Sequence, residues 1–146
     1  MIPTDQALAP VIRAHVDAVL ERLRAHPYLE HNVFEGLVPQ VDGETRNDYV
    51  SVFWNSGRRS GERLDGLDIN LTMTFTFHWV SINPATAGDL AQAGLGQLIG
   101  WTPTIAGRKC WRLGNHTSLP IDAEKSITPW LWFGVDTLDL KSTPAN

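Results

Sequence analysis

The clearest pattern in the sequence is a strict alternation of apolar and polar residues over positions 68–79. The apolar positions are Ile69, Leu71, Met73, Phe75, Phe77 and Trp79. Because side chains alternate between the two faces of a strand, this pattern predicts a β-strand with one buried face. Burial of these side chains, at about 1.5–3 kcal/mol each, would anchor a hydrophobic core.

The polar face of the same strand is rich in threonine, which is stiff at its first side-chain torsion. A stiff, uncharged surface of this kind suits contact with water or with another subunit. The candidate residues for that role are Thr72, Thr74, Thr76 and His78.

Two other segments have the spacing of helices. Apolar residues recur three or four positions apart from Leu8 to Leu23, and Pro27 closes this first helix. The second helix is predicted over residues 84–100, where it has one charge, Asp89, and interior glycines that each cost about 1 kcal/mol relative to alanine. Close packing by the sheet on one side and by a neighbouring subunit on the other would explain that composition. The candidates for the subunit contact are Gly88, Gln92 and Gly96.

Shorter apolar stretches predict the remaining strands. They cover residues 32–39, 49–55, 107–114, 117–121 and 129–140. The 146 residues therefore predict a single α+β domain, 1–146, with a mainly antiparallel sheet flanked by two helices. The last residues, from about 141, are predicted to form a flexible tail.

Charge and cysteine content narrow the possible functions. The net charge is −4 and the sequence has no long basic block, so we expect no tight non-specific binding of nucleic acid. The single cysteine, Cys110, excludes an internal disulfide and an all-cysteine metal cage. The first residues lack the layout of a signal peptide and no apolar run is long enough for a membrane span, so we expect synthesis in the cytoplasm and no membrane contact.

Catalytic residues do not form a recognisable motif. Pairs such as His116 with Ser118, or His78 with Asp136, can be drawn, but no G-x-S-x-G elbow accompanies them. The histidines at 15, 26 and 31 lack the spacing of zinc ligands, and we expect them to be solvated on the surface. The sequence therefore predicts no enzyme activity, no cofactor and no metal site.

The sequence has six tryptophans, which is many for this length. They are Trp54, Trp79, Trp101, Trp111, Trp130 and Trp132. Three interpretations stay open: packing in the core, anchors of a protein interface, or the walls of a pocket that stacks a sugar or another ligand.

Four stretches, in this order and at this spacing, resemble the tail terminator proteins of long-tailed phages, especially those that infect actinobacteria. The stretches are HPYLEHNVFEGLVP, YVSVFWNSGRRSGERLDG, GWTPTIAGRKCWRL and SITPWLWFGVDTLDL. The resemblance covers most of the chain, from the first helix to about Leu140. The stretches consist of packing and turn residues, so the resemblance lies in their order.

The resemblance implies a homo-oligomeric ring, with six subunits, that caps the head-proximal end of the tail tube. Such a ring stops tube polymerisation and offers a surface to the head connector protein. DNA would pass through the ring without specific binding, and no cofactor or catalytic step is implied. The expected location is the virion, at the head-proximal end of the tail, and the host cytoplasm during assembly.

The stretch SGRRSGERLDG, residues 56–66, is predicted to be a flexible loop between two strands. Its Arg58, Arg59 and Arg63 are candidates for pairs with carboxylates of the tail tube protein or of a neighbouring subunit. The simpler interpretation is a solvated loop. Two other functions stay open: a head-side connector or stopper protein, and a small aromatic-lined domain that binds a ligand or carbohydrate.

Overall fold

A computed structural model describes residues 4–36, 48–55, 58–60 and 70–145. Within these residues, two helices and seven strands follow one another. They are α1 (Thr4–Arg24), β1 (Val33–Glu35), β2 (Asp48–Trp54), β3 (Arg58–Ser60), β4 (Asn70–Ser81), α2 (Pro84–Leu98), β5 (Arg108–Cys110), β6 (Gly114–Glu124) and β7 (Leu131–Pro144).

The strands form one sheet in which β4 and β7 are the central pair. β2 and β3 both pair with β4 along its other side, and β6 and β5 both pair with β7. Only the β1–β2 pair is parallel, while the other pairs between described strands are antiparallel. The predicted α+β class with a mainly antiparallel sheet is confirmed.

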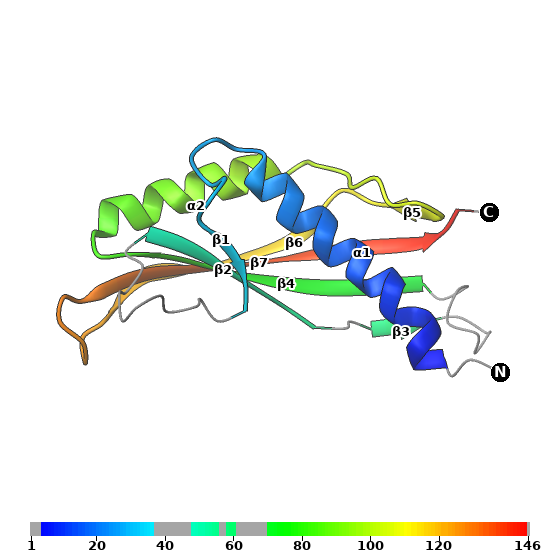
Figure 1. Cartoon of the computed structure of the whole chain (residues 1–146), viewed down its shortest axis with the longest axis horizontal. Coiled ribbons are helices and arrows are strands. Elements are labelled where there is room, and N and C mark those ends of the chain that lie inside the picture. Colours follow the sequence, from blue (N-terminus) through cyan, green and yellow to red (C-terminus); the bar gives the residue numbers. More distant parts are fainter. Residues whose placement is uncertain (1–3, 37–47, 56–57, 61–69, 146) are drawn as a thin grey trace.

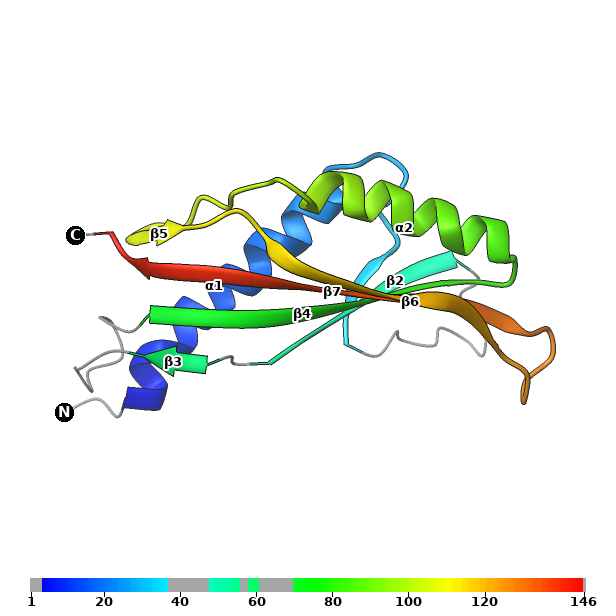
Figure 2. The same ribbon diagram turned by 180° about the vertical axis from the view of Figure 1, so that it is seen from behind.

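Both helices pack on the same face of the sheet, with α1 crossing the strands and α2 lying along one side (Figures 1 and 2). We call this side the helix face and the opposite side the outer face. The alternation in β4 is confirmed, because its apolar side chains lie on the helix face with almost no exposure. These buried residues are Leu71, Met73, Phe75, Phe77 and Trp79.

Helix α1 forms from the predicted apolar stripe, which supplies Ile12, Val16, Val19, Leu20 and Leu23 to the core. The opposite side of α1 is charged, and the Arg13 guanidinium donates to the carboxylates of Asp17 and Glu35 at 2.8–3.0 Å. Trp54 of β2 donates its indole N–H to Glu35 at 2.8 Å. These contacts fix α1 against β1 and β2.

The interior glycines of α2 have two different explanations. A Cβ added at Gly94 would overlap the indole of Trp79, so glycine is required for the close approach of the helix to β4. A Cβ added at Gly96 would meet nothing within 4 Å. Contact with the sheet therefore explains the glycine at position 94. No contact within the described part of the subunit explains the glycine at position 96, which lowers helix stability.

The prediction of a solvated His15 is wrong. The ring is fully buried on α1, where its Nδ1 donates to the Val11 carbonyl and its Nε2 lies 2.6 Å from the Ser142 hydroxyl. Because a carbonyl can only accept, the neutral ring carries its proton on Nδ1 and accepts the hydroxyl proton at Nε2. Burial, opposed in part by the Val11 bond, lowers the pKa of His15, and the charge of Arg108 lowers it further.

The predicted flexible tail from about 141 is also corrected. Strand β7 continues to Pro144 and pairs with β5, so residues 141–144 belong to the sheet. Ser142 is buried, and the Arg108 guanidinium donates to its backbone oxygen at 3.1 Å. The paired backbone and the bond from His15 hold this segment in place.

The arginine-bearing segment differs from the prediction in the same way. Residues 58–60 form strand β3, with Arg58 opposite Thr72 and Arg59 opposite Leu71 in the register with β4. β4 is longer than β2, so the chain leaving β2 finds further backbone partners along the start of β4. These two arginines therefore lie in the sheet rather than on a projecting loop, and Arg63 lies outside the described residues.

Candidate functional site

The outer face of the sheet carries the predicted threonine surface. Thr72, Thr74, Thr76 and His78 are half-buried and share this face. Thr74 donates its hydroxyl to Asp139 at 2.7 Å, and the His78 ring lies 5.0 Å from the ring of Phe53. Burial lowers the pKa of His78. No described helix covers this face, so its threonine side chains, with the buried Asp139 carboxylate among them, form a stiff polar surface.

The three residues of α2 that were predicted to contact a neighbouring subunit, Gly88, Gln92 and Gly96, lie in two different environments. The position of Gly88 faces β6, where an added Cβ would lie 3.7 Å from Ile121. Gln92 and Gly96 are exposed. The structure therefore places Gly88 against the sheet of its own subunit and leaves the other two residues on a smooth helix surface.

The β6–β7 hairpin extends past the end of α2 and forms the most exposed part of the described sheet (Figure 1). Every residue of β6 from 115 to 122 is exposed, and β6 pairs on one side only, with β7. Four large apolar side chains of the hairpin contact solvent: Leu119, Ile121, Ile127 and Trp130. The sequence misses this feature, because a short apolar stretch such as residues 117–121 does not show whether its strand is central or at an edge.

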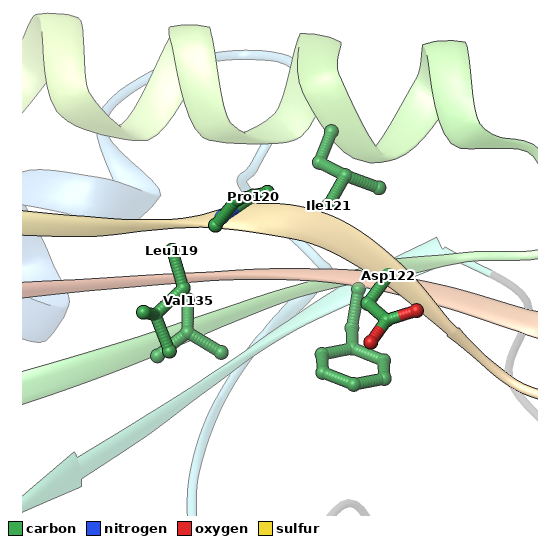
Figure 3. A pocket seen from close by; sticks show the side chains of 6 residues that line it. Leu119, Pro120, Ile121, Asp122 and Val135 are labelled. Carbon is green, nitrogen blue, oxygen red and sulfur yellow. The ribbon is translucent and has the colours of Figure 1, made fainter.

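A shallow surface cavity of about 300 Å³ lies in the hairpin (Figure 3). Ile121 points toward α2, whereas Leu119, Asp122 and Val135 lie on the other side of the strands (Figure 3). The register of β6 with β7 shifts between Leu119 and Asp122, and Pro120 lies within that irregularity. A bulge and a proline both limit edge-to-edge pairing of a strand with another chain.

A second cavity, of about 210 Å³, lies at the other end of the sheet. Its lining consists of Trp111, Arg112, Gly114, Asn115, Asp139 and Lys141. Asn115 has a left-handed backbone, with φ of 54°, a conformation that asparagine tolerates better than most residues. Its side-chain amide donates to Asp139 at 2.9 Å. The buried Asp139 carboxylate is therefore satisfied by Thr74 and Asn115, and the cationic side chains around the cavity stay exposed.

The buried carboxylate of Asp136 bonds two ring N–H groups. Its carboxylate accepts the indole N–H of Trp79 and the Nε2–H of His116, both at 2.7 Å. Trp79 and Asp136 lie on the helix face, while His78 lies on the outer face. The structure therefore pairs His116 with Asp136 and separates His78 from Asp136. Asp136 and Asp139 also lie on opposite faces, because residues three apart on a strand point to opposite sides of the sheet.

The described residues contain no group of three or more His, Cys, Asp and Glu side chains that could hold a metal ion. Within the same part of the chain, no helix is long and apolar enough to cross a membrane. Cys110 is half-buried, and burial raises the pKa of its thiol.

No family model matches the sequence, and no curated protein matches it. The fold does have solved counterparts. One is a chain in the structure described as the virion of a native gene transfer agent (GTA) particle. That chain and this one share a TM-score of 0.57 and 20% sequence identity, over 87% of this chain and 92% of the other. At this identity the likeness shows the fold, and it extends over almost the whole of both chains.

Proposed function

We propose that the protein is a structural subunit of a virion. The observation that carries the proposal is the fold shared with a chain of the gene transfer agent virion over 87% of this chain. The hairpin is consistent with it, because its exposed apolar side chains, Leu119, Ile121, Ile127 and Trp130, can be covered by a neighbouring subunit.

Within that class we propose a tail terminator, as the resemblance of the four sequence stretches implies. The protein would form a ring of six subunits on the head-proximal end of the tail tube, stop tube growth and join the tail to the head connector. Its mechanism is steric and needs no catalytic residue or cofactor. DNA would cross the ring without specific binding, which a lumen without clustered cations permits.

Ring formation requires two different surfaces on each subunit that fit one another head to tail. The described structure offers the outer face, with Thr72, Thr74, Thr76 and His78, and the smooth side of α2, with Gln92 and Gly96. We propose that each lines the lumen or a neighbouring subunit. Gly88, which packs toward Ile121 of its own subunit, supports the helix position rather than the contact itself.

Electron microscopy of the protein mixed with tail tubes tests this function. The proposal expects a ring at one end of each tube and none along the wall. A protein that ignores tube ends and binds the portal side of heads would be a head-side connector instead. Tryptophan fluorescence that is saturably quenched by a sugar, in a protein that stays monomeric, would favour the ligand-binding alternative.

The role of the arginine segment has its own test. Arg58, Arg59 and Arg63 are proposed to pair with carboxylates of the tube protein or of a neighbour. Replacing all three with serine is expected to reduce ring binding to tube ends and to lengthen the tails. Normal tail length and normal virion yield would remove this role and leave the rest of the proposal standing.

A further inference from the structure

Among the described residues, the two ends of the long sheet differ in charge. At the end where β7 finishes, Lys109, Arg112 and Lys141 are exposed around the exposed indole of Trp111, and we call these four residues the basic end. The Lys109 ammonium lies 5.5 Å from the centre of the Trp111 ring, and the Trp111 backbone N–H bonds to the Lys141 carbonyl. The carboxylate beside them, Asp139, is already occupied by Thr74 and Asn115.

The opposite end, where β6 turns into β7, is acidic and apolar. Asp122, Glu124, Ile127 and Trp130 are all exposed there, and we call these residues the hairpin tip. Among the described residues of the hairpin, the one cation is Lys125, which lies over the Trp130 ring at 5.2 Å. Asp48, at the start of β2, is exposed at this end of the sheet as well, because its register partner Ser81 pairs with Trp132 of β7.

The two ends are too far apart to neutralise each other within one subunit. Leu131, the register partner of Glu124, and Lys141 both belong to β7. At about 3.3 Å per residue, the ten residue steps from Leu131 to Lys141 span roughly 33 Å. Charges in physiological salt are screened beyond about 8 Å, so each end presents its charge to other molecules.

We infer that the hairpin tip of one subunit docks on the basic end of the next copy. This inference rests on the proposed ring and names the contact that closes it. Asp122 and Glu124 would face Arg112 and Lys141, while Ile127 and Trp130 would cover Trp111. The apolar side chains give the contact its persistence, and the charges set its orientation and rate, because exposed ion pairs alone contribute little.

A second copy fits these observations better than nucleic acid does. A DNA backbone would satisfy the cations of the basic end but would leave Ile127 and Trp130 of the hairpin tip exposed. A copy of the chain pairs both ends at once. The two surfaces are different, so the contact is heterologous, and contacts of that type close into rings when the rotation per subunit is right.

Charge reversal tests the contact by sedimentation velocity, without tail tubes. One variant carries Asp122→Lys and Glu124→Lys, and the other carries Arg112→Glu and Lys141→Glu. The wild-type protein is expected to self-associate, and each variant alone to associate about tenfold more weakly. An equimolar mixture of the two variants is expected to regain association, since each lysine-bearing tip then meets a glutamate-bearing end. The chain with all four changes should also regain it, which excludes misfolding as the cause.

Three results would overturn the inference. They are a wild-type protein that stays monomeric at the highest concentrations, variants that associate as the wild type does, and a mixture that fails to recover. The same variants are also tested for binding of labelled duplex DNA. If only the Arg112→Glu, Lys141→Glu variant loses DNA binding while its self-association is unchanged, the basic end binds DNA and the inference is wrong. Failure of the terminator function would appear instead as bare tube ends beside normal self-association.

Discussion

Strands β4 and β6 lie on either side of β7 in the same sheet and both carry alternating apolar residues, yet their side chains meet different surroundings. In β4, Phe75, Phe77 and Trp79 are fully buried beneath two helices. In β6, Leu119 is 63% exposed and Ile121 is 40% exposed. The central strand contributes fully buried side chains to the core, whereas the edge strand leaves its apolar side chains exposed.

The largest expected difference between the two strands is in the free energy of unfolding. Phe77→Ala removes a fully buried ring from the core and should cost about 3–5 kcal/mol. Leu119→Ala removes a side chain that is already mostly solvated and should cost less than about 0.5 kcal/mol. Urea denaturation followed by tryptophan fluorescence measures both. Equal losses would mean that the hairpin belongs to the folding core.

A matched pair of glycine changes sharpens the distinction on α2. Gly94→Ala forces a methyl group against Trp79 and should destabilise the protein by about 1–3 kcal/mol. Gly96→Ala places a methyl group in open space and should stabilise the helix by up to about 1 kcal/mol. Thermal unfolding of the two variants is the measurement. Destabilisation by Gly96→Ala would show that something within the subunit covers this position.

Removing the buried carboxylate of Asp136 should affect stability more than removing an exposed carboxylate on the hairpin. Asp136→Ala leaves the Trp79 indole N–H without its acceptor and should cost about 1–3 kcal/mol. Asp122→Ala, on the exposed hairpin, should change stability by less than about 0.5 kcal/mol. Chemical denaturation checks both variants, and a neutral Asp136→Ala would mean that Trp79 finds another acceptor.

The smallest expected effect is a pH dependence that originates in the interior. The pKa of His15 is lowered in the folded protein by burial and by Arg108, whereas the unfolded chain titrates near 6.5. Below that pH the unfolded state binds more protons, so stability should fall as the pH drops from 7 toward 5. His78, whose pKa is also lowered, adds to this loss.

Replacing the buried histidine isolates its share of that dependence. His15→Gln should lower stability at pH 7 and flatten the loss between pH 7 and 5, measured by denaturant titration at each pH. The matched control is His31→Gln, which removes a histidine from the exposed surface. A profile that keeps the wild-type slope in His15→Gln would assign the pH dependence to other groups.

The sequence predicts the buried interior well, because the spacing of apolar residues along a helix or strand determines which of its faces is buried. The alternation in β4 and the stripe of α1 each produce the buried faces that they indicate. It does not predict that β6 lies at an edge, since strand order depends on pairings between residues far apart in the chain. It also misses the buried His15, whose partner Ser142 lies at the opposite end of the sequence.

The candidate site likewise contains one group of residues that a local pattern predicts and another that depends on long-range strand pairing. Thr72, Thr74, Thr76 and His78 share one face because the pleat requires it, so their grouping follows from the sequence alone. The cations around Trp111 come together only through the pairing of β5 and β7, which no local pattern reveals. For the two arginines of β3 the local pattern is misleading. The glycine-rich composition predicts a loop, whereas the long neighbouring strand β4 supplies backbone partners and residues 58–60 form a strand.

The most direct test of the proposed function is the growth of purified tail tubes, followed by light scattering, as this protein is added. The account predicts that elongation stops when about six copies are present per growing end, far below the amount of tube protein. Elongation that continues unchanged, or that stops only when the protein matches the tube subunits in number, would contradict a cap that acts at the tube end.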